Sequence, residues 1–374
     1  MVIEVRNTLH IRLRKEIDES YDIVIGTNLF ERLAKELKAD SLGTKYAIIT
    51  DSNVGPLYAG KLKDSLKAEG LEGAVFTFKA GEENKARKTK EQLEDTMFKS
   101  GFGRDSAVIA LGGGVTGDLA GFVASTYNRG IPFVQVPTTV MAMADSSIGG
   151  KTGINTKAGG KNSIGIIQQP FRVYMDISML KTLGNGDFLS GLAEMVKHGV
   201  ILNLSFFEYL ERNVAGILAR DDEILVSLAK QNCFIKGSVI EQDSREKGLR
   251  QILNYGHTIG HAIEQLSDYM LGHGEVVSIG MVVEGRIASK MGLLPEKDLE
   301  RQVSLLNKLG LPTKVPPKVD GRKVLEATAQ DKKTRNGKVM YALPKRLGEM
   351  ESFKGKHTAI VEDSIILESI EESK

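Results

Sequence analysis

Residues 107–118 read AVIALGGGVTGD, and this stretch decides the expected fold. Its first five residues are apolar and include Val108 and Ile109, so they predict a buried β-strand. Gly112, Gly114 and Gly117 then follow the spacing G-x-G-x-x-G. Glycines at these positions permit a tight turn and let the backbone approach a pyrophosphate at the N-terminus of the next helix. An ordinary strand-to-helix turn could contain the same glycines, so the neighbouring elements must decide between the two interpretations.

The flanking sequence repeats the alternation of strands and helices. Short apolar runs predict strands at residues 46–50, 74–78 and 133–136, and amphipathic stretches predict helices at about 58–69 and 87–100. Strands that alternate with helices indicate parallel βαβ units, in which helices cover both faces of the sheet. The first half of the chain is therefore expected to form a Rossmann-like α/β domain that binds a nucleotide.

The second half of the chain has a different pattern. From Phe188 onward, apolar residues recur at helical spacing, most clearly in residues 224–241 and 276–291, and residues 339–343 form a rare strand-like run. A turn-rich cluster at residues 183–187 separates the two patterns. We expect an α/β plus all-α protein, with a Rossmann-like parallel-sheet domain at residues 1–186 and a mainly helical domain at residues 187–374.

The composition is that of an ordinary globular protein. The 374 residues include 41% hydrophobic and 26% charged residues, and the formal net charge is +2. A nearly balanced charge argues against nucleic acid as a partner, and no apolar run approaches the ~20 residues that a membrane helix needs. The N-terminal residues show no secretory signal, so a cytoplasmic location is expected. The single cysteine, Cys233, excludes an internal disulfide and a cysteine-rich metal site.

One feature departs from the usual dinucleotide-binding fingerprint. The acidic residue expected ~20 positions after the glycines is missing, because residues 131–134 read IPFV. Asp51, at the end of an earlier predicted strand, is the better candidate for binding the ribose. A helix cap or a turn would explain Asp51 equally well on local sequence. The dinucleotide site remains the prediction, in a sheet whose strand arrangement is not the standard one.

Histidines cluster in one part of the predicted helical domain. His257, His261 and His273 are three of the six histidines in the chain, and the spacing of the first two places them on one face of a helix. Glu194 lies in an apolar helical stretch, where a carboxylate is costly unless it is paired or bound to a metal. A carboxylate and two imidazoles that leave positions open form a catalytic type of site for Zn²⁺ or a similar ion. Spacing alone does not decide which of His257 and His261 binds the ion, and both could.

Basic residues lie beside these motifs. Because the overall charge is nearly balanced, a local cluster of lysine and arginine would indicate an anionic ligand. The glycine-rich segments 149–151 and 159–162 are interpreted as flexible loops that present ammonium groups to a phosphate or carboxylate. Most lysines are surface residues, but Lys197 lies within an apolar run and Arg250 shortly precedes the histidine helix. The basic residues near the motifs are Arg129, Lys151, Lys161, Lys197, Lys236 and Arg250.

Together the motifs resemble those of the 3-dehydroquinate synthase family. The resemblance extends from Asp51 to Pro344 and rests on several motifs in a fixed order, each of which is modest alone. They are residues 112–118 (GGGVTGD), 137–139 (PTT), 145–155 (DSSIGGKTGIN), 191–197 (GLAEMVK), 250–261 (RQILNYGHTIGH) and 273–275 (HGE). The resemblance implies an NAD-binding domain followed by a helical metal- and substrate-binding domain, and a homodimer.

The resemblance also implies roles for individual residues. Glu194, His257 and His273 would bind a divalent ion, Zn²⁺ or Co²⁺, while His261 would contact the substrate. The implied catalytic residues are Lys151, Lys197, Arg250, Asn254 and His261. The implied substrate-binding residues are Arg129, which would close over a phosphate, Asp145, Asn162, Lys236 and Lys333. The implied NAD contacts are Asp51, Ser52, Asn53, Glu82, Lys85, Gly113, Gly114, Val115, Asp118, Thr138, Thr139, Lys151, Lys161, Leu180, Lys181 and Thr182. The segment between Lys151 and Lys161 is one residue longer than is usual in the family, which bears on the assignment of Lys161 and Asn162.

The chemistry implied by the resemblance is a ring closure. The substrate would be a sugar-acid phosphate, 3-deoxy-D-arabino-heptulosonate 7-phosphate, in the shikimate route to aromatic amino acids. The implied steps are transient oxidation by NAD⁺, elimination of phosphate, reduction by the same NADH and intramolecular aldol closure to 3-dehydroquinate. Oxidation beside the proton to be lost makes that proton acidic, so elimination needs little strong base. The implied enzyme is a carbon–oxygen lyase, in which the protein mainly positions groups and stabilises charge.

Three other functions fit part of the pattern. Another sugar-phosphate cyclase would share the metal site, but some of those enzymes resemble Asp-Phe-Gly-His-Thr followed by Ser-Pro where this chain has NYGHT at 254–258 and GH at 260–261. A polyol or alcohol dehydrogenase would follow Pro-Thr-Thr with Thr-Gly-Ser-Glu, where this chain has MAMAD at 141–145. A non-catalytic sensor of NAD or metal would not need the full set of catalytic residue types. Arg250, Asn254 and His261 favour the carboxylate-bearing precursor of dehydroquinate.

Overall fold

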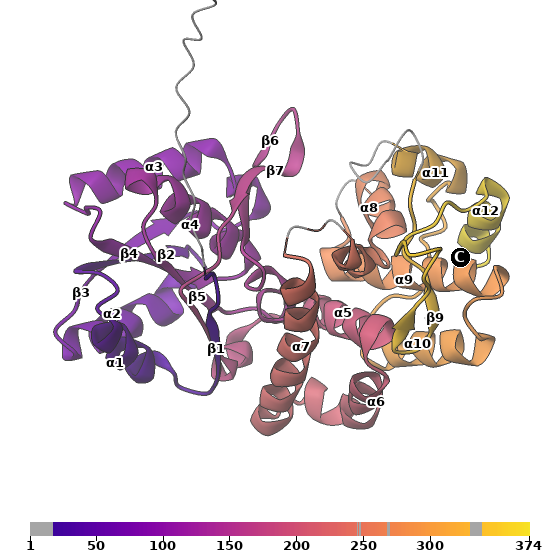
Figure 1. Cartoon of the computed structure of the whole chain (residues 1–374), viewed down its shortest axis with the longest axis horizontal. Coiled ribbons are helices and arrows are strands. Elements are labelled where there is room, and N and C mark those ends of the chain that lie inside the picture. The colour runs from indigo at the N-terminus through magenta and orange to yellow at the C-terminus, as the bar shows by residue number, and fades with distance from the viewer. Residues whose placement is uncertain (1–17, 245, 247, 268–269, 330–338) are drawn as a thin grey trace, which may run out of the picture.

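The structure, a computed structural model, describes residues 18–244, 246, 248–267, 270–329 and 339–374. A sheet flanked by helices occupies the first half of the chain and a mainly helical body the second half, with α5 (Asn185–Leu202) and α7 (Asp222–Gln242) between them (Figure 1). The expected α/β plus mainly helical fold is therefore confirmed. None of the described helices combines the length and the apolar character that a membrane span needs.

A parallel sheet forms the centre of the first half. Within the described residues it has six strands in the order β1–β8–β5–β4–β2–β3. Side chains alternate between its faces, so Ile48 packs toward α1 and α2, and Ile49 toward α3 and α4. The strands are β1 (Asp22–Gly26), β2 (Lys45–Asp51), β3 (Glu72–Phe78), β4 (Ser106–Gly112), β5 (Phe133–Pro137) and β8 (Arg172–Asp176). The helices are α1 (Phe30–Asp40), α2 (Gly60–Ala68), α3 (Arg87–Lys99) and α4 (Gly114–Thr126).

The strand order reverses between β2 and β4. Counted from β2, the strands β2, β3, β4, β5 and β8 lie in the doubly wound order 2-1-3-4-5. In this order, ligands bind outside the carboxyl ends of the first and third strands. Thr50 of β2 pairs with Leu111 of β4, so the next residues along the two strands, Asp51 and Gly112, emerge at the same edge. The sheet therefore places Asp51 beside the glycine-rich turn. Asp51 can thus take the place of the acidic residue that is missing downstream of the glycines.

Two segments expected to be flexible loops instead form a β-hairpin. β6 (Lys151–Thr156) pairs antiparallel with β7 (Gly160–Ile167), so Lys151 and Lys161 belong to strands. A Cβ atom on Gly165 would lie 2.0 Å from the carbonyl oxygen of Thr152. The expectation was wrong because the glycines of these two segments were interpreted as a sign of flexibility. Gly159 instead lies in the turn between the strands, Gly160 begins β7, and Gly165 farther along β7 permits the two strands to approach closely.

The second half consists mainly of packed helices. α8 and α9 approach so closely that a Cβ on Gly280 would lie 1.9 Å from the carbonyl oxygen of Gly256. The helices are α5, α6 (Leu204–Leu218), α7, α8 (His257–Leu266), α9 (His273–Lys290), α10 (Glu296–Lys308), α11 (Gly321–Ala329) and α12 (Asp363–Glu371), and a small sheet contains β9 (Pro344–Arg346) and β10 (Glu349–Met350).

The strand-like run at residues 339–343 is not a strand. Tyr341 forms a single bridge with Ala359, and β9 begins only at Pro344. Tyr341, Ala342 and Leu343 are buried among the helices. The prediction was wrong because an apolar run signals burial, which a helical core provides as well as a sheet does.

Two glycine-to-alanine changes test the close packing of α8 on α9. Gly280→Ala is expected to lower the free energy of unfolding by about 1–3 kcal/mol, because the added methyl group meets the backbone of Gly256. Gly237→Ala on α7 is the matched control, since nothing lies within 4 Å of its added Cβ. That variant should gain up to ~1 kcal/mol from better helix propensity. Urea unfolding of both variants measures the difference, and equal effects would contradict the packing described.

Candidate active site

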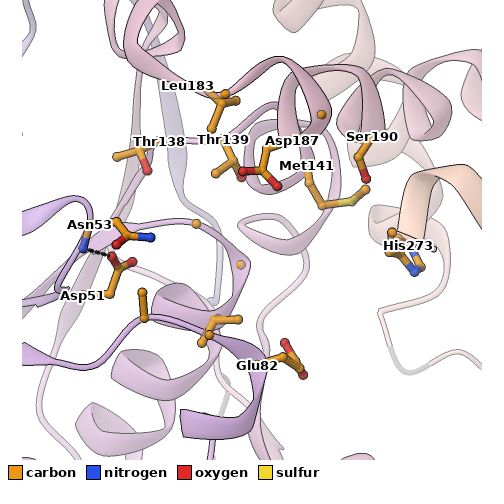
Figure 2. A pocket seen from close by; sticks show the side chains of 18 of the residues that line it. Asp51, Asn53, Glu82, Thr138, Thr139, Met141, Leu183, Asp187, Ser190 and His273 are labelled. Carbon is orange, nitrogen blue, oxygen red and sulfur yellow. Dashed lines mark hydrogen bonds between the residues drawn. The ribbon is translucent and has the colours of Figure 1, made fainter. Parts of the chain in front are cut away.

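A cavity of about 1340 Å³ extends from the edge of the sheet to the helical half. Asp51 and Asn53 lie at one end and His273 at the other, with Thr138 and Thr139 between them (Figure 2). A typical pocket for one small ligand measures about 300–1,000 Å³. The cavity is therefore large enough for a dinucleotide that extends toward the histidines.

Most of the predicted NAD contacts line the sheet end of this cavity. Asp51 accepts hydrogen bonds from the backbone N–H groups of Asn53, at 2.8 Å, and Val54, at 3.0 Å, and from the Thr116 hydroxyl at 3.1 Å. Asp51 thus shapes the turn after β2 and also faces the cavity, so the two interpretations of this residue are compatible. The predicted contacts that line the cavity are Asp51, Asn53, Glu82, Gly113, Gly114, Val115, Thr138, Thr139, Lys161 and Thr182.

Lys85 and Asp118 form a buried pair next to the glycine-rich turn. The Lys85 Nζ lies 2.5 Å from Asp118 Oδ2 and 2.5 Å from Asn162 Oδ1. Burial raises the pKa of Asp118 to about 6, although Lys85 opposes this effect. Neither Lys85 nor Asp118 is among the residues that line the cavity. The pair joins α4 to the hairpin that contains Asn162.

The remaining predicted NAD contacts lie farther from the cavity wall. The Ser52 hydroxyl accepts the N–H of Ala80 at 3.0 Å, and Lys181 forms an ion pair with Asp222 at 2.6 Å. Leu180 is buried, and its carbonyl accepts a hydrogen bond from Arg220 at 2.8 Å. Arg220 also donates to Asn185 at 2.7 Å, so it ties the segment before α5 to the first residue of that helix.

Glu194 lies at the centre of the predicted metal site. Its Oε1 atom is 3.2 Å from Nε2 of His257 and 3.2 Å from Nε2 of His273, and its Oε2 atom is paired with the Lys197 ammonium. Burial raises the pKa of Glu194, but Lys197 and the two histidines outweigh this effect and hold it well below its ordinary value. Three elements, α5, α8 and α9, thus bring together one carboxylate and two imidazoles.

The protonation of His257 suits a metal ligand. Burial and then the charge of Lys197 lower the pKa of His257 to about 4, so the ring is neutral near pH 7. The Nδ1 atom of His257 lies 3.1 Å from the carbonyl oxygen of Tyr255. Both the Tyr255 carbonyl and Glu194 accept hydrogen bonds, so the neutral ring donates to only one of them. With an ion between Nε2 and Glu194, Nδ1 would bear the proton and donate to Tyr255. This donor set of one carboxylate and two imidazoles fits Zn²⁺ or Co²⁺.

His261 joins the same group of rings. Its ring centroid lies 5.3 Å from that of His257 and 5.9 Å from that of His273. The compact group of potential ligand atoms contains His257 and His273 together with Glu194. His261 lies one helical turn along α8 from His257, so it faces the space beside the group, where a substrate could bind.

Predicted substrate-binding groups gather next to Glu194. Lys236 on α7 is buried and lies 2.5 Å from Asp145 Oδ1. Burial lowers the pKa of Lys236, and Asp145 only partly offsets this. Arg250 is also buried, and its side chain donates to the carbonyl of Ser244 at 2.9 Å. Lys197, Lys236 and Arg250 therefore concentrate positive charge around the carboxylates, as an anion-binding site requires.

Two predicted substrate-binding residues are not placed in the site. Arg129 is exposed and follows α4, whereas the cavity lies at Gly114, at the other end of this helix. The 13 residues of α4 span about 20 Å, so Arg129 does not reach the cavity of its own chain. Lys333 lies outside the described residues.

Comparison with known proteins identifies the family. Models of the 3-dehydroquinate synthase N-terminal and C-terminal regions match residues 75–190 and 191–334. A 3-dehydroquinate synthase of Desulforamulus reducens is 45% identical over 338 residues, which cover 90% of this chain and 94% of the relative. The chain belongs to the 3-dehydroquinate synthase family.

Solved structures of similar fold contain both expected cofactors. A 2-deoxy-scyllo-inosose synthase complexed with carbaglucose-6-phosphate, NAD⁺ and Co²⁺ is 29% identical, with a TM-score of 0.86 and coverage of 94% of this chain and 96% of the other. A 2-epi-5-epi-valiolone synthase from Streptomyces hygroscopicus subsp. jinggangensis 5008, with NAD⁺ and Zn²⁺ bound, is 28% identical, with a TM-score of 0.86 and coverage of 97% and 99%. The 3-dehydroquinate synthase family thus shares its fold with cyclases that bind NAD⁺ and a divalent ion.

Sequence reasoning missed Glu246, which contacts two of the predicted catalytic residues. Its carboxylate is paired with the Lys151 ammonium and accepts a hydrogen bond from Asn254 at 3.4 Å. Burial raises the pKa of Glu246, but the hydrogen bond and the charge of Lys151 outweigh this and lower it. Glu246 lies in a polar segment that is typical of an exposed turn, so no local signal distinguishes it.

Sequence reasoning also missed His198 and Asn232. Both are fully buried, and His198 Nδ1 lies 2.7 Å from Asn232 Oδ1, while Asn232 Nδ2 donates to the Ala144 carbonyl at 2.9 Å. This chain of contacts links α5 and α7 to the residue before Asp145. Burial, followed by the charge of Lys197, lowers the pKa of His198 to about 4. The only available signal was a histidine directly after Lys197 in the family motif.

The low pKa of His198 predicts a pH dependence of stability. Its ordinary value is 6.5 and its folded value about 4, so between these values the unfolded chain binds a proton that the folded chain does not. The free energy of unfolding of the metal-free protein should therefore fall as the pH falls from 6.5 to 4. His198→Gln should reduce this slope by up to about 1.4 kcal/mol per pH unit. Urea unfolding at several pH values measures the slope, and an unchanged slope in the variant would refute the assignment.

Proposed function

We propose that this protein is a 3-dehydroquinate synthase, a carbon–oxygen lyase that converts 3-deoxy-D-arabino-heptulosonate 7-phosphate to 3-dehydroquinate and phosphate in the shikimate pathway. The observation that supports this function best is the convergence of Glu194 and His257 with His273, which lines one end of a cavity whose other end is lined by the glycine-rich turn. Buried cations beside the same carboxylate suit a substrate that has both a phosphate and a carboxylate.

In this proposal, each part of the site has its own task. Bound NAD⁺ would supply reversible hydride transfer, and a divalent ion held by Glu194, His257 and His273 would polarise substrate oxygens. The Lys197 ammonium is paired with Oε2 of Glu194 on the same helix, α5, so Lys197 lies beside the predicted ion site. Lys236 and Arg250 would hold the anionic groups of the substrate, and Asp145 partly offsets the lowering of the Lys236 pKa by burial.

Two further points belong to the proposal. The division at residues 1–186 and 187–374 would place the NAD contacts up to Thr182 in the first domain and the metal ligands in the second. The homodimer expected from the family would explain Arg129, which is remote from the cavity of its own chain and would be available to the site of a second copy. A cytoplasmic location remains a prediction of the sequence.

Other sugar-phosphate cyclases are the second candidate. The two solved neighbours named above belong to this class and have the same fold at 28–29% identity. The 45% identity to a 3-dehydroquinate synthase and the combination of Arg250, Asn254 and His261 favour the dehydroquinate precursor. Arg250 supports this preference because a guanidinium binds a carboxylate in a geometry that a neutral sugar does not offer.

The proposed reaction is tested by phosphate release. Purified protein with NAD⁺ and Zn²⁺ or Co²⁺ should release phosphate from 3-deoxy-D-arabino-heptulosonate 7-phosphate and form 3-dehydroquinate without net NADH, since the cofactor is reduced and reoxidised within each turnover. Removal of the ion by a chelator should abolish both products. Net accumulation of NADH would support a dehydrogenase instead. No turnover by protein shown to bind NAD⁺ and the ion would indicate a different sugar phosphate.

Replacement of Glu194 tests the metal site separately. Glu194→Gln should weaken Zn²⁺ binding and phosphate release by more than about 100-fold, because changes even to groups that only support a ligand cost about 10–100-fold. Glu211→Gln is a suitable control, since Glu211 pairs with Arg301 on the surface at 2.6 Å. Ion content after dialysis and initial rates give the two readouts. Retention of the ion by Glu194→Gln would exclude Glu194 as a ligand.

A further inference from the structure

The helix that contains His257 begins without a side-chain cap of its own. Gly256 precedes α8 with a positive φ of 78° and has no side chain that could accept a hydrogen bond. The N–H groups at the start of a helix lack partners within the helix, so α8 needs an acceptor from elsewhere.

Glu284 of α9 provides that acceptor. Its Oε2 atom accepts the N–H of Gly256 at 2.7 Å, and its Oε1 atom accepts the N–H of Ile259 at 3.1 Å. These positions, the N-cap and the third residue of the helix, are the two that a capping box satisfies with residues of the helix itself. One carboxylate from a neighbouring helix therefore does the work of both partners in a capping box. His257 lies between the two N–H groups that Glu284 accepts.

Further contacts fix the same turn on α9. The hydroxyl of Tyr255 lies 2.8 Å from the carbonyl of Met281, and the carbonyl oxygen of Tyr255 lies 3.1 Å from Nδ1 of His257. Glu284 and Tyr255 are fully buried, and neither lines the cavity. Burial of a carboxylate is costly unless hydrogen bonds compensate it, and here the bonds join the helix of His257 to the helix that begins at His273.

We propose that Glu284 is a positioning residue for the metal centre. It holds the first turn of α8 against α9, so that Nε2 of His257 and Nε2 of His273 both face the same oxygen of Glu194. The inference rests on the proposed function only in that it takes Glu194, His257 and His273 as the metal ligands. Glu284 acts through the backbone on both sides of His257, without contact with substrate or NAD.

Ion affinity measures this role without reference to turnover. The dissociation constants for Zn²⁺ and Co²⁺ are determined by competition with a chelator in the full-length protein, for the wild type and for Glu284→Gln. Glutamine has the same shape, but its amide nitrogen would face one of the two N–H groups. An amide nitrogen cannot accept a hydrogen bond, so that N–H group would lose its acceptor. The variant is expected to bind both ions about 10–100-fold more weakly, with a changed visible absorption spectrum of bound Co²⁺.

Asp298→Asn is the matched control. Asp298 is a buried carboxylate of α10 that also accepts a backbone N–H, that of Leu347 at 3.2 Å. It should leave both dissociation constants within about twofold of the wild type, whatever it does to the melting temperature. If Glu284→Gln does not fold, Glu284→Asp replaces it, because its shorter arm cannot reach both N–H groups.

The outcomes separate this inference from the proposed function. Unchanged ion affinity and an unchanged Co²⁺ spectrum in a folded Glu284 variant would overturn the positioning role while leaving the metal site intact. Weakening by Asp298→Asn as large as by Glu284→Gln would attribute the effect to general destabilisation and would also overturn it. A wild-type protein that binds neither ion would overturn the metal site itself and the inference with it.

Discussion

The buried carboxylate of Glu194 is the interaction on which the arrangement of the helical half depends. A carboxylate removed from water is strongly destabilising unless cations or hydrogen-bond donors surround it. Lys197 is a local partner, three residues along α5, but His257 and His273 are distant in sequence. The fold must therefore hold the N-terminal ends of α8 and α9 against the middle of α5. Glycine makes this approach feasible, because a Cβ on Gly274 would lie 1.9 Å from the carbonyl oxygen of Ser190.

The same helix also connects the metal site to the sheet. A Cβ on Gly191 of α5 would lie 2.3 Å from the backbone nitrogen of Met141, which follows β5 by a few residues. Beyond Met141, the carbonyl of Ala144 accepts a hydrogen bond from Asn232, which in turn contacts His198 of α5. The segment that leaves the nucleotide edge of the sheet is thus fixed to the helix that contains Glu194. The two ends of the cavity are therefore connected through α5.

How much of this could be predicted depended on whether the signal was local. The strands at 46–50 and 107–111 are predicted by short apolar runs and the helix at 276–291 by apolar residues at helical spacing. Glu194 stands out because it is charged within an apolar helix. Glu246 gave no comparable signal, since it lies in a polar segment. Glu284 is charged within the apolar helical stretch 276–291, as Glu194 is within its own, but the sequence does not name the N–H groups of α8 as its partners. The hairpin of β6 and β7 was missed because its glycines have two physical uses, freedom to turn and close approach of strands. The run at 339–343 was misassigned because burial alone does not distinguish a strand from a segment packed on helices.

The two oxygens of Glu194 are used differently, and this division bears on how metal and lysine can coexist. Oε1 faces both imidazole nitrogens, whereas Oε2 is paired with Lys197. An ion bound on the Oε1 side would not need to displace the ammonium, although both are cations. One carboxylate would then balance two cations, because Oε1 would bind the ion while Oε2 stays paired with Lys197. Glutamine at this position could serve only one side, since its amide nitrogen neither binds a cation nor pairs with an ammonium. The carboxylate is therefore required by the lysine as well as by the ion.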